Sequence, residues 1–103
     1  MGFFNLLGNN TNTVSIEEYL EKNAIVIDVR TEMEFMEGHV SGSKNIPLDR
    51  ISSFIEEIKK YDKPVITCCR SGARSGSAAN TLKQNGIDAI NGGPWQNVAD
   101  RMQ

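Results

Sequence analysis

Cysteine and histidine are scarce in this sequence: of 103 residues, two are cysteine and one is histidine. The cysteines, Cys68 and Cys69, are neighbours, and adjacent residues cannot form an ordinary disulfide without strain. There is no C-x-x-C pair, and a single histidine cannot build a zinc site alone. We therefore expect no disulfide staple, no metal and no cofactor. The free thiols favour a reducing compartment, which predicts a cytoplasmic location.

The chain also lacks an excess of basic residues and any long apolar run. Its formal net charge is −2, which argues against a dedicated nucleic-acid binder, because such proteins present a basic surface to the phosphates. The apolar runs are only a few residues long, whereas a membrane-spanning helix needs about 20. We therefore expect neither a nucleic-acid partner nor a membrane span.

The N-terminal segment is apolar for a few residues but carries no targeting signal that we can identify. It has no basic n-region and no small-residue cleavage site, and Leu6 stands where an N-myristoylation motif needs serine or threonine. We interpret residues 1–12 as an N-terminal arm and residues 13–103 as one domain. The alternative for the arm is a weak contact with a membrane surface or a partner.

Helical and strand patterns alternate along the rest of the chain at short spacing. Two capping boxes, Ser15 with Glu18 and Thr31 with Glu34, predict helix starts. This alternation is typical of an α/β fold with a small, open parallel sheet and helices on both faces. We predict strands at 24–27, 44–46, 64–68 and 87–90, helices at 16–21, 32–37, 48–58 and 75–85, and a turn at 91–94.

The segment 69–74 joins a predicted strand to a predicted helix. Loop amides and helix N-terminal N–H groups would surround the sulfur of Cys69, and the helix dipole would favour negative charge there. The same field stabilises a thiolate, the nucleophilic form of cysteine. We therefore predict Cys69 as the nucleophile, in an anion-binding loop made of Arg70, Ser71, Gly72, Ala73, Arg74 and Ser75.

Cys68 is the last predicted strand residue, so its side chain should point away from that of Cys69. We interpret Cys68 as a small buried hydrophobic residue. The alternative is a resolving thiol that forms a strained bond with Cys69 on oxidation.

Several motifs together resemble the rhodanese-like, single-domain sulfurtransferase family over residues 13–95. The resemblance is carried by the sequences Asp28-Val29-Arg30, Glu34, Gly38-His39-Val40-x-Gly42-x-x-Asn45-Ile46-Pro47, the Cys69-to-Arg74 loop and Gly92-Gly93. It implies a rhodanese-like α/β domain with about five parallel strands. Members of the family continue further after these glycines, and the shorter tail here puts the final helix in doubt.

The resemblance implies a two-step transfer of sulfane sulfur. The Cys69 thiolate would attack the outer sulfur of a small anionic donor such as thiosulfate, release sulfite and hold the sulfur as a persulfide. Cyanide or a thiol, including a protein thiol, would accept it. Arg70 and Arg74 would attract and orient the donor. Asp28 and Arg30 would support the loops, with Glu34 pairing to Arg30, and His39 would be a loop hydrogen-bonder.

Two other functions remain open. Cysteine phosphatases and arsenate reductases also place cysteine and arginine in one loop, but with five intervening residues, whereas four separate Cys69 from Arg74. A shorter loop leaves little room for phosphate. A rhodanese-fold sulfur carrier or regulatory binding module without turnover is the second alternative.

Overall fold

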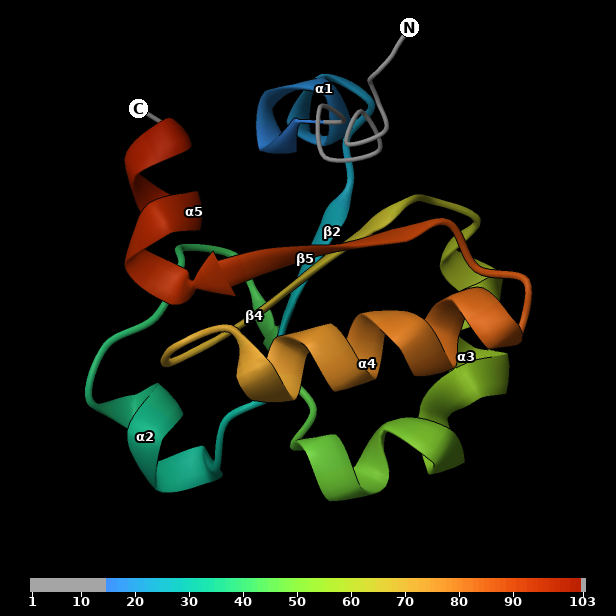
Figure 1. The fold of residues 1–103 in the computed structure, drawn as a ribbon, viewed down its shortest axis with the longest axis horizontal. Coiled ribbons are helices and arrows are strands. Elements are labelled where there is room, and N and C mark those ends of the chain that lie inside the picture. The colour runs from blue at the N-terminus through green and yellow to red at the C-terminus, as the bar shows by residue number, and fades with distance from the viewer. Residues whose placement is uncertain (1–14, 103) are drawn as a thin grey trace, which may run out of the picture.

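The computed structural model describes residues 15–102, and this part of the chain forms a four-stranded parallel sheet with the strand order β3-β2-β4-β5 (Figure 1). The strands are β2 (Ile25–Asp28), β3 (Lys44–Asn45), β4 (Val65–Cys69) and β5 (Ala89–Pro94). The predicted α/β class is confirmed. Within residues 15–102 there are four strands, where the resemblance implied about five. The predicted arm, residues 1–12, lies outside the described residues.

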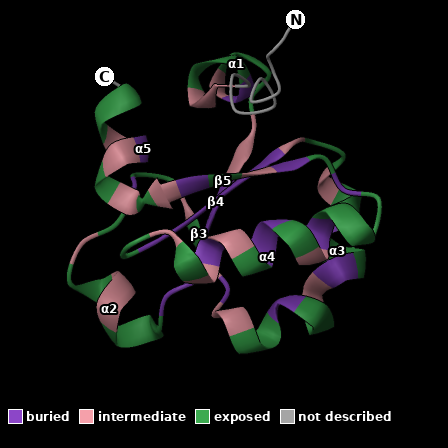
Figure 2. Ribbon diagram, in the orientation of Figure 1, coloured by how far each residue is buried: buried purple, intermediate pink, exposed green. Residues whose placement is uncertain are grey.

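Helices cover both faces of the sheet, and the buried residues lie on the strands and on the helices packed against them (Figures 1 and 2). One face carries the 3₁₀ helix η2 (Leu48–Phe54), α3 (Ile55–Tyr61) and α4 (Ala73–Gln84). The other carries α1 (Ile16–Glu21) and α5 (Trp95–Arg101). The short helix α2 (Glu32–Met36) follows the carboxyl end of β2. Among residues 15–102, no helix is long and apolar enough to cross a membrane.

Both predicted capping boxes are present. The Ser15 hydroxyl accepts the Glu18 amide at 3.0 Å, and the Glu18 carboxylate accepts the Ser15 amide at 3.0 Å. Thr31 and Glu34 make the same exchange at 3.2 and 3.0 Å. Such caps satisfy amides that the first helical turn leaves unpaired, and each contributes about 1 kcal/mol. They explain why helices of only five or six residues begin where they do.

The central strand β4 is buried along its whole length. Because successive side chains of a strand point to opposite faces of the sheet, the two cysteines lie on different faces. Cys69 packs in the cluster under α3 and α4, whereas Cys68 packs in the cluster under α1 and α5. The predicted opposite orientation of the two side chains is therefore confirmed.

The predicted turn at residues 91–94 is wrong, because β5 runs through this segment to Pro94. Asn91 is in register with Thr67, and Pro94 with Cys69, across a register shift. A Cβ at Gly92 would lie 2.7 Å from both Ile66 and Val98 side-chain carbons. Gly92 therefore allows β5 to pack closely against β4 and α5, and it does not mark a reversal of the chain.

The C-terminal tail also differs from the expectation, because it forms the helix α5. Val98 is completely buried, which anchors the helix to the sheet. Two smaller differences concern other helices: the segment 48–58 begins as the 3₁₀ helix η2 before becoming α3, and α4 begins at Ala73 rather than Ser75.

Candidate functional site

The sulfur of Cys69 lies at the carboxyl end of β4, inside the loop that leads to α4. The residue is completely buried. Its Sγ accepts the Gly72 amide at 3.0 Å and the Ser75 amide at 3.4 Å, and it lies 3.2 Å from the Ser75 hydroxyl. Gly72 has φ of +108°, a conformation that favours glycine, and it caps α4. The loop therefore closes around the sulfur with N–H groups pointing inward.

This geometry affects the ionisation of the two cysteines in opposite ways. Burial alone would raise the pKa of Cys69, but hydrogen bonds from the Ser75 hydroxyl and from the amides of Ser75, Gly72 and Ser71 lower it below the usual 9.0. Burial raises the pKa of Cys68 to about 12, and the Asp28 charge raises it as well. A thiolate is thus favoured at Cys69 and disfavoured at Cys68.

Glu34 pairs with Arg74 and not with Arg30, so the predicted pairing is wrong. The Arg74 guanidinium donates to both carboxylate oxygens of Glu34, at 2.8 and 3.1 Å. The hydrogen bonds from Arg74, and then from the Thr31 amide, lower the pKa of Glu34 to about 2. The capping box explains the difference, because it holds Glu34 in the first turn of α2, on the side that faces the Cys69 loop.

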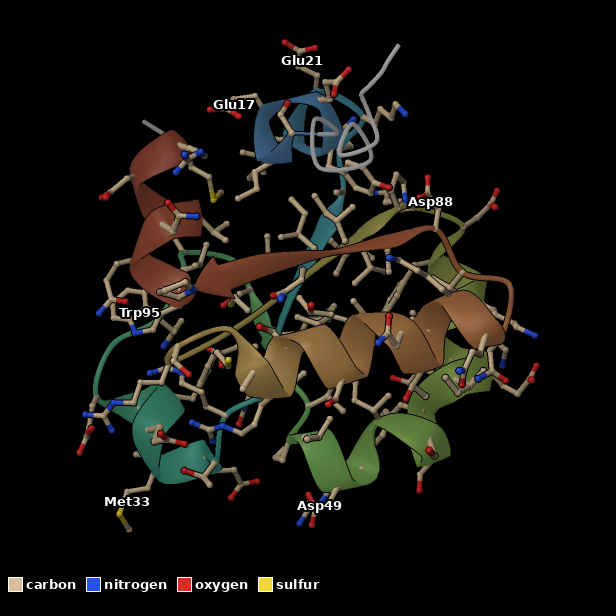
Figure 3. All side chains as sticks on the ribbon, in the orientation of Figure 1. Glu17, Glu21, Met33, Asp49, Asp88 and Trp95 are labelled. Atoms are coloured by element: carbon tan, nitrogen blue, oxygen red, sulfur yellow. The ribbon has the colours of Figure 1, made fainter. Side chains whose placement is uncertain are left out.

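Arg30 instead forms a buried ion pair with Asp28, two residues before it. Its Nε and Nη2 donate to the Asp28 carboxylate at 2.9 and 2.6 Å. Nη2 also donates to the Gly38 carbonyl at 2.7 Å, and the guanidinium lies 5.2 Å from the centre of the Trp95 ring. In Figure 3, Trp95 lies at the start of α5 on the side toward α2. The pair therefore connects the end of β2 to the loop at Gly38, and the supporting role of Asp28 and Arg30 in the site stays a prediction.

Arg70 is the exposed cation of the site. Its side chain is 79% exposed, and Glu34 lies 3.9 Å away, a loose contact compared with the Arg74 pair. Beside it is a pocket of about 210 Å³ lined by Arg30, Glu34, Glu37, Gly38, Arg70, Trp95 and Gln96. A larger hollow of about 540 Å³ lies at the other end of the sheet, near Pro64 and Asp88, and no cysteine lines it.

Asn91 is a site residue that the sequence interpretation did not identify. It accepts the Ser75 hydroxyl at 2.6 Å through Oδ1 and donates to the Gly72 carbonyl at 3.0 Å through Nδ2. The incorrect turn at 91–94 concealed this role, because only the extended β5 brings Asn91 beside α4.

His39 donates through Nδ1 to the Phe35 carbonyl at 2.8 Å and stacks on the Phe35 ring, so its predicted role as a loop hydrogen-bonder is confirmed.

Three similarities to known proteins agree with this architecture. An uncharacterized protein of Bacillus subtilis, YqhL, is 42% identical over 80 residues, which cover 76% of this chain and 63% of that protein. The thiosulfate sulfurtransferase GlpE of Pseudoalteromonas translucida is 34% identical over 74 residues, which cover 71% of this chain and 70% of the relative. The crystal structure of reduced Bacillus anthracis CoADR-RHD superposes with a TM-score of 0.69 and 31% identity.

The extent of these matches differs between the relatives. The superposition includes 84% of this chain but only 15% of the Bacillus anthracis chain. The match to the Bacillus subtilis protein spans less than two thirds of that protein. The family described as the Rhodanese-like domain matches residues 13–95, which include the capping boxes, the Asp28–Arg30 pair and the Cys69 loop. The chain belongs to the rhodanese-like domain family.

Proposed function

We propose that this chain is a sulfurtransferase that carries sulfane sulfur on Cys69. The proposal depends mainly on the surroundings of the Cys69 sulfur at the end of β4. Two backbone amides, of Gly72 and Ser75, and the Ser75 hydroxyl lie 3.0 to 3.4 Å from this sulfur. These groups favour the thiolate, and the loop contains no histidine or carboxylate that could act as a base. A preformed thiolate suits attack on sulfur, which requires no proton transfer.

In the first half-reaction, the thiolate attacks the outer sulfur of thiosulfate or a similar donor. A bond forms between Sγ and that sulfur, the sulfur–sulfur bond of the donor breaks, and sulfite leaves with its electron pair. The amides of the loop then face the persulfide, and the N-terminus of α4 favours its negative charge. In the second half-reaction, cyanide or a thiolate attacks the outer sulfur and Cys69 returns as a thiolate.

The two loop arginines have different roles in this proposal. Arg70, exposed and loosely paired, attracts the dianionic donor to the loop. Arg74 is engaged by Glu34 in a two-bond pair, so it fixes the loop to α2 and leaves Arg70 as the cation for the donor. This engagement also argues against phosphatase or arsenate reductase chemistry, because those reactions need the loop arginine to hold the oxyanion.

The proposal is tested by assaying sulfite and thiocyanate after the protein is mixed with thiosulfate and cyanide. We expect both products in equal amounts and repeated turnover. Sulfite release limited to one equivalent, without thiocyanate, would favour the sulfur carrier. Hydrolysis of an aryl phosphate by the wild type, lost in Cys69→Ser, would contradict the proposal.

A further inference from the structure

The side-chain amide of Asn91 has a fixed orientation, although the residue is exposed and lies on the edge strand β5. Its Oδ1 accepts the Gly93 amide at 2.9 Å, and its Nδ2 donates to the Gly72 carbonyl at 3.0 Å. A backbone amide can only donate and a carbonyl can only accept, so the oxygen and nitrogen of Asn91 cannot be exchanged. Oδ1 therefore faces Ser75.

Gly76 makes room for this arrangement. A Cβ at Gly76 would lie 3.2 Å from Asn91 Nδ2, closer than ordinary van der Waals contact. The amide therefore lies over a residue that has no side chain, in the first turns of α4. Asn91 joins three parts of the site: the loop at Gly72, the helix at Ser75 and its own strand.

The Ser75 hydroxyl has one proton and two acceptors within reach. Asn91 Oδ1 lies 2.6 Å from Oγ, and Cys69 Sγ lies 3.2 Å from it. A hydroxyl can donate to only one of them at a time. When the proton points to Asn91, the lone pairs of Oγ face the sulfur, and this arrangement suits a protonated thiol that donates to Ser75.

We propose that Asn91 holds the Ser75 hydroxyl away from Cys69 and releases it when the sulfur becomes negative. Asn91 is thus a positioning residue, and Ser75 touches the reacting sulfur. The catalytic meaning of this exchange rests on the proposed sulfur transfer, but the exchange itself depends only on the three side chains. After release, Oδ1 keeps the Gly93 amide as a donor, so this oxygen is not left unpaired.

In sulfur transfer, the exchange acts when the persulfide is discharged. The acceptor thiolate bonds to the outer sulfur, the bond between the two sulfurs breaks, and its electron pair remains on Cys69 Sγ. The Ser75 hydroxyl then turns from Asn91 to this new negative charge, which makes Cys69 a better leaving group. No proton leaves Ser75, and no oxidant or reductant is needed.

The charged groups around Cys69 lie on other elements and are not changed by substituting Asn91. Arg74 of α4 is paired with Glu34 of α2, and Asp28 is paired with Arg30 after β2. Arg70 points to solvent. A shift in Cys69 ionisation caused by Asn91 would therefore not report on a rearranged charge, and the Ser75→Ala background separates the effect of Ser75 from that of the Gly72 carbonyl, which Asn91 also binds.

The test measures the pH midpoint of Cys69 alkylation by iodoacetamide, in a Cys68→Ala background so that one thiol remains. We expect Ser75→Ala to raise the midpoint, because the thiolate loses a donor. Asn91→Ala should lower it, because the hydroxyl then has only the sulfur to bind. Each shift should be on the order of one pH unit. In Ser75→Ala/Asn91→Ala the midpoint should equal that of Ser75→Ala alone.

Asn91→Leu provides a second variant of similar size without an acceptor, and Asn97→Ala is the matched control. Asn97 donates to the Gly92 carbonyl at 3.2 Å and takes part in none of the hydrogen bonds between Ser75, Cys69 and Asn91, so the Cys69 midpoint in this variant should match the wild type. The proposal is overturned if both Asn91 variants raise the midpoint or leave it unchanged, or if their effect persists without Ser75. Alkylation does not require sulfur transfer. A chain that formed no persulfide would therefore contradict the proposed function, while the alkylation midpoints would still decide whether Asn91 controls the Ser75 hydroxyl.

Discussion

Glu34 holds Arg74 in a two-bond ion pair that connects α2 to the Cys69 loop across 40 positions of sequence. Both residues of the pair are only partly exposed, Glu34 at 22% and Arg74 at 35%. The Thr31 amide and hydroxyl donate to the same carboxylate, at 3.0 and 3.1 Å. The loop geometry thus depends on a helix that contributes no atom to the sulfur site.

Glu34→Gln should weaken the pH dependence of stability in acid. The folded pKa of Glu34, about 2, lies below its usual 4.5, so the pair stabilises the fold above about pH 4.5 and the contribution is lost as the pH falls toward 2. Partial exposure limits the effect to about 1 kcal/mol. Urea unfolding of wild type and variant at pH 7 and pH 3 measures it. Glu37→Gln, on the same segment, is the control, and equal acid sensitivity of wild type and Glu34→Gln would refute the expectation.

Asp28→Asn should destabilise the fold strongly. Asp28 is completely buried and Arg30 is only 5% exposed, so the substitution leaves a buried guanidinium without its counter-charge. Breaking one side of such a pair costs about 3–5 kcal/mol. Chemical denaturation at neutral pH measures the loss. A change below about 1 kcal/mol would show that water or a rearranged Arg30 compensates.

Arg70→Gln should weaken donor capture while leaving the chemistry of the bound donor nearly intact. We expect KM for thiosulfate to rise several-fold with little change in kcat, because the arginine is exposed and contributes no hydrogen bond to Cys69. The dependence of kcat/KM on ionic strength should also decrease. Arg50→Gln, an exposed arginine on η2, is the control. An unchanged salt dependence in Arg70→Gln would mean that Arg70 is ordinary surface charge.

Much of the fold followed from local patterns in the sequence. The capping boxes located two helix starts, and the β-branched runs located β2, β3 and β4 to within one residue, whereas β5 extends four residues past its predicted end. The period of two along β4 placed Cys68 and Cys69 on opposite faces. Each of these features is determined by residues that are close together in the sequence, so it can be predicted from the sequence alone.

The remaining features depend on contacts between distant residues. Gly92 and Gly93 have the composition of a turn, and the need for a glycine at position 92 of β5 is visible only from the close approach of Ile66, Thr67 and Val98. The partner of Glu34 was predicted wrongly, because charge alone does not distinguish Arg30 from Arg74. Asn91 was missed because its role exists only when β5 lies beside α4.

Cys69→Ser should abolish sulfur transfer, whereas Cys68→Ser should retain most of it. The first change removes the only thiol that the loop amides contact, and the second alters a side chain on the other face of β4. Turnover of thiosulfate with cyanide, at matched protein concentration and with melting curves to confirm folding, measures both. Loss of activity in Cys68→Ser with retention in Cys69→Ser would reverse the assignment.

The most direct measurement is mass spectrometry of the intact protein and its peptides after incubation with thiosulfate. We predict a gain of one sulfur atom, located on Cys69, lost on addition of cyanide or a thiol and absent in Cys69→Ser. An unmodified Cys69, or an added sulfur on Cys68, would contradict the central claim that the buried thiolate at the end of β4 carries the sulfur.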